Sequence, residues 1–297
     1  MGSAIAAMMS LVILVYSSAS GAVPVIGTVV AKGTFRLDNA TVNGNATLFE
    51  GATIETKSAA SRMELSSGAR VSLGTDSKAK FFGDHMILEK GEGRLEKAES
   101  FRFEARGLVI QPETGNASAR VALTGGARIE LAALSGSFRV LNSQGLLIAN
   151  VASGHALELE PQAGEIATRL TGTLHQAGGH FLLTDETTLV TVELTGSGLA
   201  KEVGNRVEIT GKMDPTFTPV TDASQFIRVT AIKHLGSGTA EASGAAAAGA
   251  GKAAAGHGIA LSATTVAIIG GVAAAATLGG LAAAGKLTGQ AASTVSR

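Results

Sequence analysis

Histidine and cysteine are the first residue types to examine for metal chemistry. The chain has six histidines and no cysteine, so a zinc site would need histidine and carboxylate ligands. Such a site needs three or four converging ligands, usually with one pair close in sequence. His175 and His180 form the close pair, on either side of a turn at Gly178-Gly179. A hairpin could bring them face to face, but the sequence favours two exposed residues at strand ends, and we expect no metal site.

Serine and carboxylate chemistry has no complete pattern. Ser135-Gly136-Ser137 lies in a predicted β-turn without a base, and no Gly-x-Ser-x-Gly segment stands at a strand-to-helix turn. Gly91-Glu92-Gly93 lacks a following helix whose N-terminus could bind phosphate. The neighbouring acids Asp185 and Glu186 are expected at a solvated hairpin tip. We therefore predict no catalytic residue, no cofactor and no enzyme activity.

Short antiparallel strands are the elements that this composition favours. The 39 glycines, the five prolines, the single tyrosine and the lack of tryptophan indicate many turns between short strands. A Gly-Ala pair followed by alternating apolar and polar residues begins at Gly51, Gly68 and Gly126. Glycine tolerates positive φ where a chain reverses, and alternation then gives the strand one buried face. We predict structural turns at these three glycines.

Residues 25–160 are predicted to form the larger β domain. Turn-forming residues recur about every 8 to 12 positions, which is typical of an all-β sandwich, barrel or roll. The expected strands are Gly33–Leu37, Arg62–Leu65, Arg70–Leu73, Lys78–Phe82, Met86–Lys90, Phe101–Ala105, Arg120–Leu123, Arg128–Leu131, Phe138–Leu141, Leu146–Val151 and His155–Glu160.

The order of motifs over residues 45–160 resembles the FecR-like extracytoplasmic domain. Ser67 to Leu73 fits the family's hairpin, Ile87 to Arg94 its central strand, and Ser153 to Leu157 its closing strand. In regulators of this family the domain is periplasmic and relays a signal to an anti-sigma segment. The resemblance implies a β-sandwich or β-roll outside the cytoplasm, with signal relay as an alternative function.

A second β segment covers residues 165–235. Five strands are expected, with one helical turn at residues 198–204 between the third and the fourth: Ala167–Gln176, His180–Thr184, Leu189–Leu194, Arg206–Lys212 and Phe226–His234. This order is that of the OB barrel, and the segment resembles small OB-like domains of exported bacterial proteins. It carries six basic and eight acidic residues, and the whole chain has zero net charge, so nucleic acid is not an expected partner.

The two hydrophobic ends predict where the protein resides. Residues 1–22 contain a short apolar run followed by small residues, which fits a signal peptide cleaved after Ala19 or Ala22; a buried N-terminal segment is the alternative. Residues 236–257 read as a Gly/Ala-rich linker.

Residues 258–285 carry no charge and are long enough to cross a bilayer as a helix. A disordered Ala/Gly tail is the alternative. The predicted membrane-spanning residues are Ile259, Val266, Ile269, Gly270, Gly271, Leu278 and Leu281.

These features together predict a non-catalytic binding or scaffold protein of the bacterial envelope. It would be exported to the periplasmic face of a membrane and held there by a single C-terminal helix in contact with lipid. An envelope protein or a glycan is the expected partner. The alternatives are a FecR-like signal-relay component and, ranked last, an enzyme acting on envelope polysaccharide, which would need two converging carboxylates.

Overall fold

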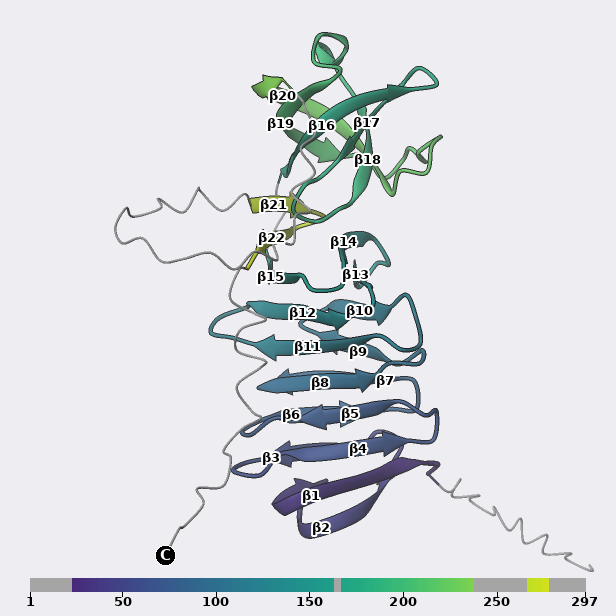
Figure 1. Cartoon of the computed structure of the whole chain (residues 1–297), viewed down its shortest axis with the longest axis vertical. Coiled ribbons are helices and arrows are strands. Elements are labelled where there is room, and N and C mark those ends of the chain that lie inside the picture. The colour runs from purple at the N-terminus through teal and green to yellow at the C-terminus, as the bar shows by residue number, and fades with distance from the viewer. Residues whose placement is uncertain (1–22, 163–166, 238–265, 278–297) are drawn as a thin grey trace, which may run out of the picture.

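The computed structural model describes residues 23–162, 167–237 and 266–277. Within these ranges the chain forms 22 strands and one short 3₁₀ helix, η1 (Leu199–Lys201). The prediction of an all-β protein is therefore confirmed. The strands build a stack of two ladders, and a barrel lies at the end of the stack opposite to the N-terminal strands (Figure 1).

Both ladders start from one long strand, β1 (Val25–Leu37), which also forms a hairpin with β2 (Ala40–Phe49). The second half of β1 pairs with the first ladder and its first half with the second ladder. In spatial order the first ladder contains β3 (Thr53–Thr56), β6 (Lys78–Phe81), β7 (His85–Lys90), β9 (Arg102–Ala105), β10 (Leu108–Pro112), β13 (Phe138–Asn142) and β14 (Leu147–Val151).

The second ladder contains β4 (Ser61–Leu65), β5 (Arg70–Leu73), β8 (Glu92–Lys97), β11 (Ser118–Leu123), β12 (Ile129–Ser135) and β15 (Ala156–Pro161). Pairing in the stack is antiparallel except between β7 and β9. The chain moves from one ladder to the other as it climbs the stack, and this places strands distant in sequence side by side (Figure 1).

Alternating side chains explain why these segments form paired strands around a shared core. In β5, Val71 and Leu73 are buried while Arg70 and Ser72 lie on the other face. Every second residue of a strand points to the same face, so each short strand contributes apolar side chains to the space between the ladders. The largest fully buried side chains of this core are those of five phenylalanines: Phe35, Phe81, Phe101, Phe103 and Phe138.

The barrel is built from β16 (Thr168–Ala177), β17 (His180–Thr184), β18 (Thr191–Thr195), β19 (Asn205–Met213) and β20 (Gln225–Ser237). The strands close in the order β16-β17-β18-β20-β19, with β19 pairing back to β16 and with β18 and β20 parallel. The predicted five strands are present, and η1 occupies the expected position between the third and the fourth.

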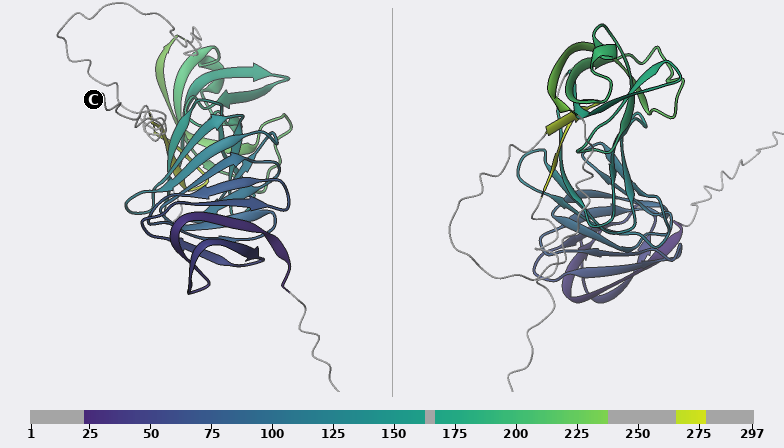
Figure 2. Two further views of the ribbon diagram at one scale, coloured as in Figure 1. Left: turned by 60° about the horizontal axis from the view of Figure 1, so that its bottom comes forward. Right: turned by 45° about the horizontal axis from the view of Figure 1, so that its top comes forward.

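A hairpin from the C-terminal region connects the stack to the barrel. It consists of β21 (Val266–Ile269) and β22 (Val272–Ala276). Strand β22 pairs with β15 of the stack over five residues, and Ile268 of β21 pairs with Arg169 of β16 in the barrel. Figures 1 and 2 show the hairpin at the junction between the two parts.

This hairpin corrects the prediction of a membrane helix over residues 258–285 for the part of that range that the structure describes, residues 266–277. Gly270 and Gly271 have φ values of 53° and 76°, which suit a two-residue hairpin turn, and valine and isoleucine on both sides favour strands. An uninterrupted apolar run cannot by itself distinguish a helix from a pair of buried strands.

The individual residues of the predicted span have different positions. Ile269 is buried and Val266 is exposed at the start of the hairpin. Ile259, Leu278 and Leu281 lie outside the described residues, as do the predicted signal peptide and most of the predicted linker. Among the residues that the structure describes, no helix is long and apolar enough to cross a membrane.

Candidate binding surfaces

Glu193 on β18 is a buried carboxylate that fixes a long loop of the barrel. Its residue exposure is 3%, although it lies on a barrel strand flanked by apolar residues. One carboxylate oxygen is 2.7 Å from His180 Nδ1, and the other accepts the backbone N–H of Val220 at 2.9 Å. The Thr221 hydroxyl also donates to this second oxygen, at 3.4 Å. Glu193 thus ties the β19–β20 loop to the start of β17.

The environment of Glu193 favours its ionised form. Burial by itself would raise the pKa of the Glu193 carboxyl, but the hydrogen bonds from Val220 and His180 outweigh burial and hold the pKa below its ordinary value. The carboxylate is therefore charged at neutral pH and acts as an acceptor only. With its oxygens already occupied by protein donors, it serves as an anchor of the loop and not as a free acid or base.

The loop that Glu193 holds presents apolar side chains to solvent. Val220 is 76% exposed and Phe217 is 53% exposed, and the Phe217 ring stacks on Phe226 with centroids 5.1 Å apart. We call residues 214–224 the anchored loop. Exposed aromatic and aliphatic side chains on a loop whose backbone is held by a buried hydrogen bond are typical of a surface that binds a partner.

Asp185 lies at the β17–β18 turn, and the expectation that it would be exposed to solvent at a hairpin tip is wrong. It is fully buried and accepts backbone N–H groups of Thr171 at 2.9 Å and Thr188 at 2.8 Å. Burial raises the pKa of Asp185 despite these hydrogen bonds. The turn also contacts the stack, because Asn150 Nδ2 donates to the Leu189 carbonyl at 3.0 Å. Asp185 therefore shapes the junction between the barrel and the stack.

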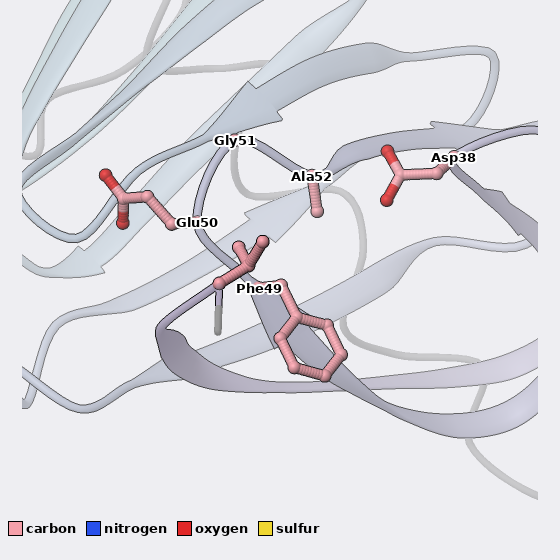
Figure 3. A pocket seen from close by; sticks show the side chains of 6 residues that line it. Asp38, Phe49, Glu50, Gly51 and Ala52 are labelled. Atoms are coloured by element: carbon pink, nitrogen blue, oxygen red, sulfur yellow. The ribbon is translucent and has the colours of Figure 1, made fainter. Parts of the chain in front are cut away.

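A second candidate surface is a hollow of about 410 Å³ at the N-terminal end of the stack. It is lined by Val23, Asp38, Phe49, Glu50, Gly51 and Ala52. In Figure 3 the carboxylates of Asp38 and Glu50 lie on opposite sides of the Gly51–Ala52 turn. Asp38 accepts the Thr53 N–H at 2.8 Å and Glu50 accepts the Gly83 N–H at 2.9 Å. Both acids hold turns of their own chain, so the hollow does not combine them into an acid–base pair.

The three predicted turn glycines lie at chain reversals and all have positive φ. The values are 78° for Gly51, 85° for Gly68 and 76° for Gly126. Gly51 borders the hollow, whereas Gly68 precedes β5 and Gly126 precedes β12. They are therefore spread along the stack, and the fold does not bring them together into one site.

The structure places the two histidines considered for metal binding in different surroundings. His175 is exposed on β16, whereas His180 is bonded to Glu193. The residues described contain no group of three or more histidine, aspartate or glutamate side chains placed to hold a metal ion.

Sequence reasoning missed the role of Glu193 and of the anchored loop. The available signal was an acid between Val192 and Leu194 in a strand where both neighbours are buried. A charged residue is rarely buried unless it is paired, so an acid in such a strand predicts a specific partner. The partner itself is 27 residues away in the loop and could not be identified from local sequence.

Comparisons with known proteins give little further information. No family model matches the chain, and no curated protein matches it. Two crystal structures of a "putative anti-sigma factor" from Parabacteroides distasonis are distantly similar, at 14% and 13% sequence identity and a TM-score of 0.31 each. Each match covers 38% of this chain and 57% or 56% of the other chain. This chain therefore spans just over half the length of those structures.

Proposed function

We propose that the chain is an exported, non-catalytic binding or scaffold protein of the bacterial envelope, and that the anchored loop of the barrel contacts its partner. The observation that carries the proposal is the buried Glu193, which holds Val220 and Thr221 in place while Val220 and Phe217 face solvent. A preorganised loop loses little conformational entropy when it binds, so its apolar contacts contribute more fully to affinity.

The connectivity of the barrel supports an OB-like assignment. A closed barrel in the order β16-β17-β18-β20-β19, with a parallel pair between the third and fifth strands, has the strand order of the OB fold. In that fold the second and third strands and the loop between the fourth and fifth strands form the ligand face. Here these elements are β17, β18 and the anchored loop, which meet at Glu193.

An envelope protein or a glycan fits this face better than nucleic acid does. Stacked aromatic and aliphatic side chains suit a sugar face or an apolar protein surface. Single-stranded nucleic acid needs a positively charged groove, whereas the buried charge here is the negative charge of Glu193.

Co-sedimentation with isolated envelope fractions tests the binding surface. We expect the wild-type protein to sediment with either the protein-containing membrane fraction or the glycan sacculi, and Phe217→Ser combined with Val220→Ser to remain in solution. Val203→Ser is the matched control, since Val203 is a 39% exposed apolar residue of the barrel outside the loop. Equal binding by the wild type and the loop variant would refute the loop as the contact surface.

Export is tested separately by fractionation with protease protection. A protein that is accessible to protease only after the outer membrane is permeabilised, and whose N-terminus has been processed near Ala19 or Ala22, supports the proposal. A fully cytosolic, unprocessed product would contradict it. Recovery of a sigma-factor partner in a pull-down would favour the signal-relay alternative over the scaffold function.

A further inference from the structure

Asn43 and Gly44 in strand β2 form the only Asn-Gly pair of the sequence. In such a pair the backbone nitrogen of the glycine can attack the carbonyl carbon of the asparagine side chain, because glycine has no Cβ to hinder the approach and its backbone is free to rotate. The other six asparagines of the chain are followed by Ala, Ser, Val or Arg. Position 43 therefore has the chemistry for spontaneous loss of its side-chain amide.

The backbone at Gly44 departs from a regular strand. Its φ is 85°, and the register of β1 and β2 shifts at this point, from Val30 opposite Asn45 to Thr34 opposite Asn43. In the described chain no residue of β1 is paired with Gly44. A regular antiparallel ladder would hold the backbone rigid, whereas an irregularity of this kind interrupts the ladder locally. The peptide bond between Asn43 and Gly44 therefore lies at a break in the pairing, where the ladder does not restrict its rotation.

The side chain of Asn43 is exposed and unrestrained. It lies on the solvent face of β2, and no hydrogen bond within the described chain holds its amide group. A Cβ built on Gly44 would have no atom within 4 Å, so the space around this glycine is open. By contrast, hydrogen bonds hold the side-chain amides of Asn142, Asn150 and Asn205. The two reacting groups can therefore approach each other without displacing a neighbour.

We propose that Asn43 is a site of spontaneous deamidation. The Gly44 nitrogen loses its proton to water or hydroxide and forms a bond to the side-chain carbonyl carbon of Asn43. The bond from this carbon to the amide nitrogen then breaks, and the nitrogen takes a proton from water and leaves as ammonia. Water opens the resulting succinimide ring at either carbonyl, which leaves aspartate or isoaspartate at position 43. Overall one water replaces one ammonia, so the reaction requires neither an enzyme nor an oxidant.

The fold can accommodate both products. Aspartate differs from asparagine at this exposed position chiefly by its negative charge. Isoaspartate adds one carbon atom to the backbone, at the point where the register of β1 and β2 is already broken. Residues 40–43 and 45–49 pair with β1 on either side of that break. The reaction thus adds a charge at the N-terminal end of the stack without unfolding it, and the modified form accumulates as the protein ages.

Peptide mapping of the purified full chain tests the site after incubation in mildly alkaline buffer. Cleavage after Arg36 and Lys57 gives one peptide that contains Asn39, Asn43 and Asn45, so the two asparagines that precede alanine are internal controls. We expect Asn43 to deamidate at least about tenfold faster than either control. An intact Asn43, or equal rates at the three positions, would overturn the proposal.

A comparison of the folded and the denatured chain tests the role of the break in the ladder. Because the break leaves the reaction unhindered, we expect the rate at Asn43 in the folded chain to be within about tenfold of the rate in denaturant. A larger suppression in the folded chain would show that strand pairing protects the bond, and would overturn the proposal.

Hydroxylamine provides an independent readout, because it traps the succinimide and cleaves the chain between residues 43 and 44. Asn43→Gln keeps an exposed amide at this position and should abolish the cleavage, whereas Asn45→Gln should leave it unchanged. Cleavage that persists in Asn43→Gln would contradict the assignment. Failure of these tests leaves the anchored loop untouched, because that surface is tested by envelope binding.

Discussion

Replacing Glu193 by glutamine tests whether a buried charge holds the anchored loop. Glutamine has nearly the same volume and keeps one acceptor oxygen, but it loses the charge and one of the two short hydrogen bonds, to His180 or to Val220. A hydrogen bond to a charged group contributes roughly 1.5–3 kcal/mol. We expect the free energy of unfolding at neutral pH to fall by about 1.5–3 kcal/mol in chemical denaturation.

The pH dependence makes this prediction specific. The pKa of Glu193 in the folded protein is below its ordinary value of 4.5. A depressed acid pKa gives a stability contribution that is present above the unfolded-state pKa and is lost as pH falls through the folded-state pKa. The difference in stability between wild type and Glu193→Gln should therefore shrink as the pH is lowered below 4.5.

Glu202→Gln is the matched control. Glu202 also lies 2.8 Å from a histidine, His234, but its side chain is more exposed than that of Glu193. Loss of its charge should have a smaller effect, because water can replace the partner. Equal effects of the two substitutions, or a Glu193→Gln effect that persists unchanged in acid, would refute the anchoring role.

Three further substitutions probe the packing of the fold. Gly93→Ala should lower the free energy of unfolding by about 1–3 kcal/mol in thermal denaturation, because its Cβ would lie 2.7 Å from the Phe103 ring. Gly270→Ala should speed hydrogen exchange in β21 and β22, because the added Cβ would lie 2.7 Å from the Leu146 side chain. The control is Gly126→Ala, since Gly126 also has a positive φ but no atom would lie within 4 Å of the added Cβ. Asn150→Ala should cost about 1 kcal/mol by removing the hydrogen bond to Leu189, and an unchanged melting temperature would contradict it.

Alternation in the sequence was sufficient to predict most of the stack. Strands such as β5 and β12 follow Gly-Ala turns and have one clearly apolar face, so local pattern and tertiary burial agree. The barrel was predictable for the same reason, including the exact bounds of β17. Strand β2 was missed because its outward face is threonine and asparagine and its inward face is weakly apolar.

Features that depend on distant partners could not be predicted. Residues 266–276 are apolar enough for either a helix or buried strands. Strands form because β22 pairs with the edge of β15, which lies more than 100 residues earlier in the chain. Asp185 was expected in solvent because its hydrogen-bond donors, the backbone N–H groups of Thr171 and Thr188, are brought to it only by the fold. Charge count alone contains no information on such contacts.

Envelope co-sedimentation of the Phe217→Ser, Val220→Ser variant beside the wild type is the most direct test of the proposed function. We expect the wild type and the Val203→Ser control to sediment with an envelope fraction, and the loop variant to stay in the supernatant while its circular dichroism spectrum is unchanged. A folded loop variant that sediments as fully as the wild type would contradict it.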